Sequence, residues 1–350
     1  MPIQRFPENP LMGPSDVKPS RPDFEVVCAF NAGCARLGSE IVLLLRVAER
    51  PAHGPDELVA PLLAPDDVSR GLQVLRVRKD DPDCEAIDSR MFKYKGRLYL
   101  TSISHLRLAR SANGKNFVID EVPAMLPEVR DEEFGIEDPR ITPIDGKFTI
   151  NYSAVSRHGV ATALAVTDDF RTFERRGLIF APDNRDVSLF PEKVGGHYAC
   201  FHRPMGAAFG QQDIWFASSP DLLHWGEHRF VCGCRPGQWD SLKVGAGAVP
   251  IKTESGWLAI YHGADHRHRY CLGCLLTDLE EPHRVIARSN EPILAPQMDY
   301  EREGFFGDVV FTCGALVETD GRVVIYYGSS DEHTCAAETT VQELLATLES

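Results

Sequence analysis

The chain has 350 residues, of which 43% are hydrophobic, and a formal net charge of -14 at pH 7. This length and composition suffice for one large core, and we expect a single domain over residues 1–350. The acidic balance argues against a nucleic-acid partner, because binding to a phosphate backbone needs a basic face. No apolar run is long enough for a signal peptide or a membrane span, so the sequence predicts a cytoplasmic protein without a membrane partner.

A short phrase recurs along the chain, a glycine followed by a mostly apolar β-run. Its six copies begin at Gly38, Gly96, Gly146, Gly196, Gly256 and Gly321. Repeats of roughly 50 to 65 residues, each too short to bury an apolar face alone, indicate stacked β-units, for which a β-propeller is the usual solution. The sequence therefore predicts an all-β fold with a central pocket.

The segments between these phrases indicate antiparallel hairpins. Strands that begin near Ala109, Ala165 and Ala217 each end in a polar turn followed by an aromatic residue. Residues 1–25 are expected to form an N-terminal extension, and the Pro-rich, acidic stretch 50–70 a surface loop.

Helical periodicity occurs at the C-terminal end of the chain. Behind Thr340 as N-cap, the apolar residues follow i, i+3, i+4, i+7 spacing at Val341, Leu344, Leu345 and Leu348. This pattern predicts a short helix over residues 340–349, packed on the outside of the β-fold.

The ten cysteines lie mostly in strand-like runs, where a reduced thiol behaves as a small buried hydrophobe. Cys271 and Cys274 form a CxxC pair, but a second pair at zinc-finger spacing and a thioredoxin-like βαβ context are both missing from the sequence. We therefore expect core thiols, and no metal or redox site.

A polar signature precedes several glycine strands and bears on chemistry. If the first strand of each unit runs beside a central axis, its acids can converge on one cleft: Asp88, Asp138, Asp186, Asp240 and Asp308. Basic residues accompany them, namely Arg90, Arg140, Lys193 and Lys243. Carboxylates among bases are typical of glycosyl transfer, which needs an acid for the leaving oxygen. The alternative is that these acids cap strands or form structural ion pairs.

Six motifs together resemble glycoside hydrolase family 130, the mannoside phosphorylases and β-mannosidases. They are GIEDPRIT at Gly135, NRDVSLFPEK at Asn184, FHRP at Phe201, WDSLKVGAG at Trp239, GWLAIYHG at Gly256 and YYGSSD at Tyr326. With FNAG at Phe30 and LLLRV at Leu43, the resemblance runs from about Asn31 to Asp331. It implies a five-bladed β-propeller with an axial site, inversion at the anomeric carbon, and no metal. The sequence has six glycine phrases, one more than the number of blades implied. We therefore expect an added hairpin over about 84–105.

The resemblance also assigns roles to individual residues. Asp138 is implied as the catalytic acid, passing its proton through the O3 hydroxyl of the bound mannose to the glycosidic oxygen. Residues implied to hold the mannose are Asn31, Arg46 and Asp331. Residues implied to bind phosphate are Asn184, Arg203, Lys243 and His262. Inorganic phosphate is then a co-substrate and no other cofactor is needed, since arginine and lysine suit oxyanion binding.

Two other functions remain open from the sequence. A β-mannosidase of the same family would replace phosphate by water, with Glu137, Glu192 or Glu227 as the base. A non-catalytic sugar-binding propeller would need no acid at all. The expected partner is a small β-mannoside oligosaccharide in each case, a homo-oligomer is compatible with the sequence, and the acceptor sugar and the β-1,4 or β-1,2 linkage stay open.

Overall fold

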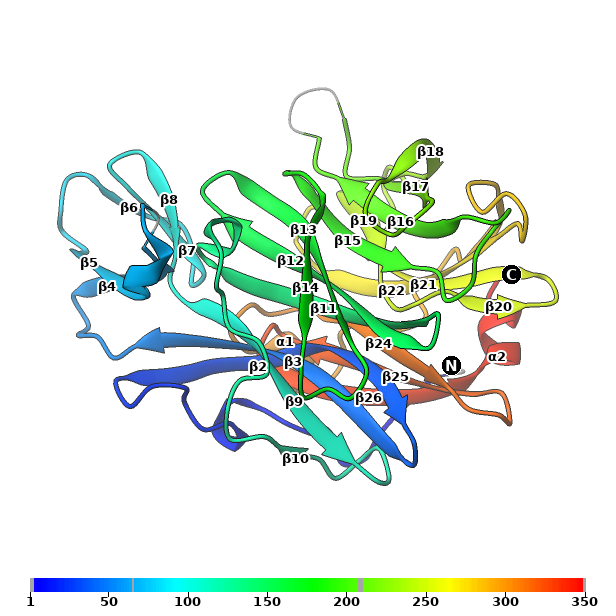
Figure 1. Cartoon of the computed structure of the whole chain (residues 1–350), viewed down its shortest axis with the longest axis horizontal. Coiled ribbons are helices and arrows are strands. Elements are labelled where there is room, and N and C mark those ends of the chain that lie inside the picture. The colour runs from blue at the N-terminus through cyan, green and yellow to red at the C-terminus, as the bar shows by residue number, and fades with distance from the viewer. Residues whose placement is uncertain (1–2, 65, 207–209, 349–350) are drawn as a thin grey trace.

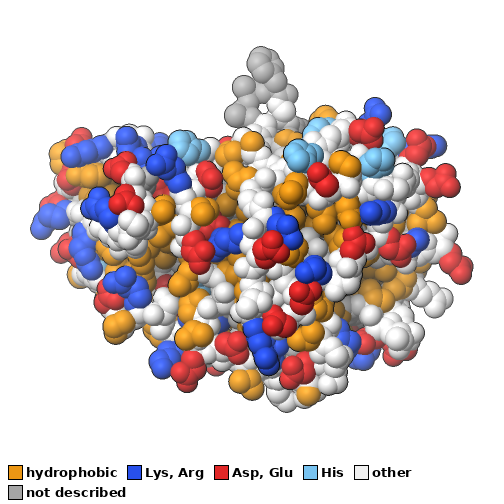
Figure 2. All heavy atoms as spheres, in the orientation of Figure 1, with side chains coloured by type: hydrophobic (Ala, Val, Ile, Leu, Met, Phe, Trp, Pro, Cys, Tyr) orange, Lys and Arg blue, Asp and Glu red, His pale blue; other side chains and the backbone are white. Residues whose placement is uncertain are grey.

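The computed structural model describes residues 3–64, 66–206 and 210–348, and it consists almost wholly of β-strands (Figure 1). The α-helices in these ranges are short, α1 at Asp299–Arg302 and α2 at Val341–Ala346. None of the helices described is long and apolar enough to cross a membrane. Acidic and basic side chains are interspersed over the face seen in Figure 2. The predicted all-β class is confirmed.

Most strands fall into five antiparallel sets, numbered here in chain order. Set 1 contains β2 (Phe24–Leu37), β3 (Glu40–Pro51), β9 (Ile103–Ser111) and β10 (Val118–Ile119). Set 2 contains β11 (Gly135–Ile144), β12 (Lys147–Ser156), β13 (Gly159–Thr167) and β14 (Glu174–Phe180). A single parallel pairing of Ser104 with Gly135 joins sets 1 and 2 into an eight-stranded sheet.

The remaining sets follow the same pattern. Set 3 contains β15 (Asn184–Leu189), β16 (Tyr198–Pro204), β17 (Ile214–Ser219) and β18 (Gly226–Cys232). Set 4 contains β19 (Lys243–Ala246), β20 (Ile251–Thr253), β21 (Gly256–Ala264), β22 (Tyr270–Thr277) and β23 (Val285–Arg288). Set 5 contains β24 (Val310–Val317), β25 (Arg322–Ser329), β26 (His333–Thr340) and, from the other end of the chain, β1 (Gln4–Arg5).

The recurring glycine phrase marks one particular strand of each set. Five of its six copies lead into β3, β12, β16, β21 and β25. At the β11–β12 hairpin, Asp145 and Gly146 have φ of +50° and +77° between the paired residues Ile144 and Lys147. Two consecutive left-handed residues make the tight turn that fits the twist of a hairpin, and glycine adopts this conformation without steric penalty.

The sixth copy, at Gly96, lies in an excursion that we call the insert, residues 52–102. β3 and β9 pair directly, with Glu49 opposite Ile103, so the insert leaves set 1 between two neighbouring strands. It forms two small sheets, β4 (Glu57–Leu63) with β5 (Leu72–Arg78), and β6 (Cys84–Ala86) with β7 (Met91–Tyr94) and β8 (Arg97–Leu100). Figure 1 shows both sheets at one end of the molecule.

The insert tests two expectations. The added hairpin expected over 84–105 is confirmed for β6–β8, whereas residues 103–105 belong to β9 of set 1. The surface loop expected over 50–70 is wrong in part, because β4 and a 3-10 turn at Val68–Arg70 lie there. β4 forms because its Ala60 and Leu62 are buried in hydrophobic clusters with Phe92 and Phe134.

Each set packs on its neighbour through a hydrophobic cluster. Representative contacts, in order along the sets, are Leu44 with Ile150, Leu164 with Leu189, Phe201 with Leu275, and Leu272 with Ile325. A further cluster joins Leu43 of set 1 to Tyr326 of set 5. The first and last sets therefore also pack against each other.

Both ends of the chain are anchored on set 5. Residues 1–25 were expected to form an N-terminal extension, and residues 1–2 lie outside the described residues. Within this extension β1 pairs with β26, and a 3-10 turn forms at Pro14–Asp16. The expected helix 340–349 is confirmed over α2, and residue 349 lies outside the described residues. The Thr340 hydroxyl accepts a hydrogen bond from the Glu343 N–H at 3.1 Å, and Leu344 is buried. Another 3-10 turn covers Arg130–Glu132.

Arg5 and Glu301 form a buried ion pair that fastens β1 to helix α1. Arg5 Nε and Nη2 donate to the two carboxylate oxygens of Glu301 at 2.7 and 3.0 Å, and the Tyr327 hydroxyl donates at 2.8 Å. The Glu301 side chain is fully buried. Burial raises the pKa of Glu301, but Arg5 and two backbone N–H groups outweigh it and lower the pKa overall. The stabilisation that this pair supplies is therefore lost as the pH falls through that lowered pKa.

We predict that Glu301→Ala lowers the free energy of unfolding by about 3–5 kcal/mol, since it leaves the Arg5 charge without its partner in a largely buried position. Urea or thermal unfolding measures the loss. The matched control is Glu281→Ala, which breaks an exposed pair with Arg284 and should change the unfolding midpoint little. Equal midpoints for the two variants would contradict the prediction.

Candidate active site

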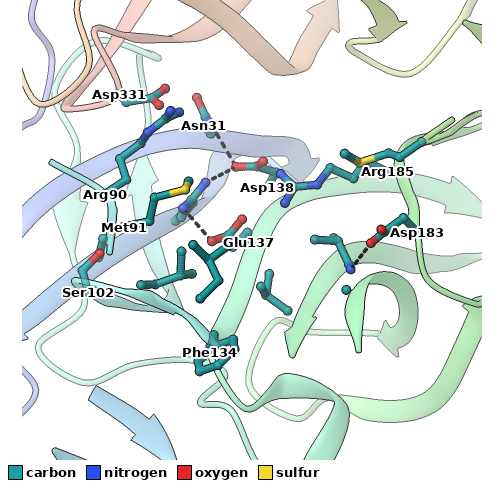
Figure 3. Close-up of a pocket in the computed structure, with 18 of the residues that line it drawn as sticks. Asn31, Arg90, Met91, Ser102, Phe134, Glu137, Asp138, Asp183, Arg185 and Asp331 are labelled. Atoms are coloured by element: carbon teal, nitrogen blue, oxygen red, sulfur yellow. Dashed lines mark hydrogen bonds and ion pairs between the residues drawn. The ribbon is translucent and has the colours of Figure 1, made fainter. Parts of the chain in front are cut away.

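One cavity of about 820 Å³ lies where the first strands of all five sets meet the insert. Its lining includes Asn31 of β2, Asp138 of β11, Arg185 of β15, Lys243 of β19 and Phe311 of β24. Several of these residues surround one space in Figure 3. The first strands thus converge on one cavity, but of the five acids expected there only Asp138 and Asp186 line it.

Three of these first strands carry a β-bulge at an Asn or Asp in the left-handed conformation. The residues are Asn31, Asp138 and Asp186, with φ of +47°, +51° and +53°, and the pairing register shifts at each. In a regular strand, consecutive side chains point to opposite faces, whereas a bulge re-aims one of them. As a result Glu137 and Asp138 both line the cavity, as do Arg185 and Asp186.

Asp138 sits at the centre of a buried hydrogen-bond network. Its Oδ1 accepts from Asn31 Nδ2 at 2.9 Å and from Arg46 Nη1 at 3.1 Å. Arg46 also donates to Glu137 at 2.7 Å and to the Ser104 hydroxyl at 3.0 Å. No described residue donates to Oδ2, so this oxygen is left to face the cavity (Figure 3).

Asp331 closes the same side of the cavity from the turn between β25 and β26, where its φ is +50°. Burial raises the pKa of its carboxyl to about 6, a shift that Arg46 reduces and Asp138 increases. Asn31, Arg46 and Asp331, which the resemblance assigns to mannose binding, are therefore brought together with Asp138. Their amide, guanidinium and carboxyl groups can accept and donate hydrogen bonds to sugar hydroxyls.

Gly328 of β25 leaves the space that Asn31 occupies. A Cβ atom built at residue 328 would collide with Oδ1 of Asn31, and no hydrogen bond to this buried Oδ1 is made by the described residues. A buried acceptor without a partner is unfavourable in the folded protein.

The opposite side of the cavity carries the positive charge. Asp186 is bound by Arg203 at 2.7 Å and lies 3.3 Å from His262 Nε2. Although burial raises the pKa of Asp186, Arg203, His262 and Arg140 hold it well below its usual range. Burial and, after it, the neighbouring Arg203 lower the pKa of Lys243 to about 8. Arg203, Lys243 and His262 are thus brought together, as the phosphate assignment requires.

Asn184 is not brought to this group. It lines a separate pocket, where its Nδ2 lies 3.0 Å from Nδ1 of His202. The next residue, Arg185, lines the active-site cavity instead, because the bulge at Asp186 interrupts the alternation of β15. Strand alternation alone would place Asn184 and Asp186 on one face and Arg185 on the other. Arg185 can be identified as a cavity residue only from the bulge, which has no signature in the sequence.

Arg185 and Lys243 differ from Arg46, Arg157 and Arg203 of the same cavity. Each of these three arginines is ion-paired to a carboxylate that also lines the cavity. Within the described ranges, Arg185 and Lys243 have no ion pair, and Arg185 Nε is buried without a hydrogen bond. Arg185 and Lys243 are half-buried cations without an ion pair among the described residues, so this side of the cavity is suited to an anion.

The remaining candidate acids and bases are mostly structural, as the alternative interpretation held. Asp240 is fully buried and paired to Arg235 and Arg288. Asp308 is exposed, and Lys193 lies over the Tyr198 ring outside the cavity. Asp88 pairs with Arg90, which does line the cavity. Arg140 pairs with Asp186 and donates hydrogen bonds to the carbonyls of Ala246 and Gly247.

Of the glutamates considered as hydrolytic bases, two lie elsewhere. Glu192 is exposed and pairs with Lys252, and Glu227 is exposed and accepts from Ser218 at 3.0 Å. Glu137 lines the cavity but is ion-paired to Arg46. Within residues 3–64, 66–206 and 210–348, no group of three or more His, Cys, Asp or Glu side chains is placed to hold a metal.

Comparison with known proteins identifies the family of this chain. A family model described as beta-1,4-mannooligosaccharide phosphorylase matches residues 88–350. Beta-1,2-mannobiose phosphorylase of Listeria innocua serovar 6a is 48% identical over 354 residues, with 100% of this chain and 99% of that protein covered. The 1,2-beta-oligomannan phosphorylase of a Thermoanaerobacter species is 41% identical over 232 residues, 65% of this chain and 76% of that protein.

The three-dimensional comparison agrees. The solved structure of the Listeria innocua beta-1,2-mannobiose phosphorylase in complex with beta-1,2-mannobiose has a TM-score of 0.96 and 47% identity, with 100% of this chain and 99% of that chain covered. The sequence match and the structural match both extend over the whole chain. The chain therefore belongs to glycoside hydrolase family 130, and the Listeria innocua and Thermoanaerobacter relatives that it matches are mannoside phosphorylases.

Proposed function

We propose that this enzyme is an inverting β-mannoside phosphorylase that cleaves β-1,2-mannobiose with inorganic phosphate to α-mannose 1-phosphate and mannose. The choice of linkage rests on the full-length similarity to the Listeria enzyme. The single observation that carries the reaction is the division of one cavity. Asp138 lies on one side with the mannose-binding candidates, and unpaired Lys243 and Arg185 lie on the other side.

We also propose that the five strand sets are the blades of a five-bladed β-propeller. Two observations support this arrangement. The hydrophobic clusters run from set 1 to set 5 and back to set 1, and the first strand of every set lines one cavity. β1 adds an N-terminal strand to the C-terminal set, a common way to hold the two ends of such a fold together.

The proposed reaction breaks one bond and forms one. A phosphate oxygen attacks the anomeric carbon of the terminal mannose from the face opposite the leaving group, and the glycosidic C–O electron pair moves to the leaving oxygen. Asp138 supplies the proton for that oxygen, through the O3 hydroxyl of the mannose. Because phosphate is itself the nucleophile, a second carboxylate that activates water is unnecessary, unlike in an inverting hydrolase.

The surrounding groups fit these roles physically. Asn31, Arg46 and Asp331 would fix the mannose against Asp138, and proximity of this kind supplies a large part of catalytic rate. Lys243, Arg203, His262 and Arg185 would hold the phosphate dianion and reduce its repulsion by Asp138 and Asp331. Glu137, the glutamate in the cavity that was considered as a hydrolytic base, is ion-paired to Arg46. Because this pair occupies its carboxylate, it favours the phosphorylase over the hydrolase.

The first test is product analysis. With β-1,2-mannobiose and phosphate, we expect equimolar mannose 1-phosphate and mannose, little turnover without phosphate, and slower reaction with β-1,4-mannobiose. Chromatography of the products measures all three. Free mannose released at a rate independent of phosphate would instead establish a hydrolase, and a preference for β-1,4-mannobiose would overturn the linkage.

A second prediction concerns Asp138. Asp138→Asn should lower kcat by about 10²–10⁴-fold, because the amide keeps the shape but cannot deliver the proton, while the unfolding midpoint changes little because Asn also tolerates a left-handed backbone. The matched control is Asp308→Asn, an exposed Asp at φ +59° outside the cavity. Near-normal kcat for Asp138→Asn would move the acid elsewhere.

A third prediction uses the pKa of Lys243, which is about 8. Lys243 is charged below this pH and neutral above it, so KM for phosphate should rise as the pH passes through 8 in the wild-type protein. Lys243→Ala should raise KM for phosphate by about 10–100-fold, the loss expected for one charged hydrogen bond, and should remove this pH dependence. An equal rise in KM for the disaccharide would contradict a phosphate role.

A further inference from the structure

The insert reaches the active site although the fold does not require it. β3 and β9 pair without interruption up to Glu49 and Ile103, so a short turn would suffice to connect them. Instead the chain makes two small sheets with their own hydrophobic cluster around Ala60, Val77 and Phe92. Long ordered excursions of this kind usually carry function. Part of the insert lines the active-site cavity, namely Arg90, Met91, the segment 96–100 and Ser102.

The segment of the insert that carries Arg90 is fastened to the loop between α1 and β24. The Ser89 hydroxyl donates to the carbonyl of Phe305 at 2.8 Å. The Arg90 guanidinium lies 3.8 Å from the centre of the Phe306 ring, which is within cation–π distance. The Thr101 N–H and hydroxyl donate to the carbonyls of Arg90 and Ser89 at 2.9 and 2.7 Å.

These contacts orient one edge of the guanidinium and leave another available. Asp88 accepts from Arg90 Nη2 at 2.8 Å and from the Arg90 backbone N–H at 2.8 Å. No described residue accepts a hydrogen bond from Nη1. A guanidinium stacked on a ring and held at one edge is pre-organised, so binding an oxyanion at the free edge loses little side-chain entropy.

The charge of Arg90 acts on both halves of the site. It is among the groups that lower the pKa of Lys243, after burial, Arg203 and Arg185, and it opposes the rise that burial causes in the pKa of Asp331. Figure 3 shows Arg90 beside Asp331 at the wall of the cavity. Arg90 therefore lies between the sugar-binding side and the cationic side, where the transferred phosphate must lie when it meets the anomeric carbon.

Building on the proposed function, we propose that Arg90 of the insert donates hydrogen bonds to the phosphate, together with Arg203 and Lys243. The insert thereby completes the phosphate site. Phosphate is favoured over a sugar hydroxyl because a guanidinium with a free edge matches the geometry and charge of a phosphate oxygen pair. Asp88, Ser89 and Phe306 are positioning residues that act through Arg90.

The test compares Arg90→Met with the wild-type protein in steady-state kinetics that vary phosphate and disaccharide separately. We expect KM for phosphate to rise by about 10–100-fold and KM for the disaccharide to change less than about twofold. Arg90→Lys should recover part of the loss, since it restores charge without the stacked fork. The matched control is Arg78→Met, an exposed arginine of the insert paired to Asp80, which should leave both constants unchanged.

Other outcomes overturn the proposal. An unchanged KM for phosphate, or an equal rise in both constants at an unchanged unfolding midpoint, would mean that Arg90 does not bind phosphate. If Arg90→Met lowers the unfolding midpoint, Phe306→Leu keeps Arg90 and removes the ring beneath it. That variant should raise KM for phosphate by a smaller factor than Arg90→Met, and no rise would contradict the proposal.

A direct titration separates this proposal from the proposed function. Isothermal calorimetry with inorganic phosphate alone needs no turnover, so it also applies if the wild-type protein proves to be a hydrolase. Weaker phosphate binding by Arg90→Met than by the wild-type protein supports the role of Arg90. Equal binding by both proteins, or no binding by the wild-type protein, overturns it.

Discussion

The active site depends on one backbone device, a bulge at an Asn or Asp with positive φ in the first strand of a set. A regular strand would send Glu137 and Asp138 to opposite faces, and likewise Arg185 and Asp186. With the bulges, both members of each pair line the cavity. Asn and Asp tolerate the left-handed conformation better than other residues with a side chain. The residue type that the backbone needs is therefore also the type that can bind sugar or carry a proton.

Electrostatic pairing then divides the cavity into two halves. On the sugar side Arg46 pairs with Glu137 and contacts Asp138, and Asp331 adds a third carboxylate, so this side is acidic. On the other side Asp186 is shared by Arg203, Arg140 and His262, and it leaves Lys243 and Arg185 uncompensated. A dianion restores the balance there, whereas water would not. The preference for phosphate as the attacking group is thus a consequence of the charges left unpaired by the fold.

Features that depend on neighbouring residues could be predicted from the sequence, whereas features that depend on pairing between strands could not. The glycine phrases predicted one strand of each set, β3, β12, β16, β21 and β25, because a tight turn and an apolar run are local features. The C-terminal helix was also predictable, from its cap and its periodicity. The place of Asn184 was not, since the bulge beside it is held by pairing of β15 with β16 and has no local signature. Arg185 was missed for the same reason.

The insert shows how such a fold can gain specificity without disturbing its core. It enters and leaves between two strands whose pairing is complete, so the hydrophobic clusters between the sets do not depend on it. It packs around its own cluster and touches the rest of the protein at the cavity, at the loop of Phe305 and Phe306, and through Leu62 at a cluster with Phe134 and Val155. Changes in the insert can therefore alter what the cavity binds while the residues on the five first strands, including Asp138, keep their positions.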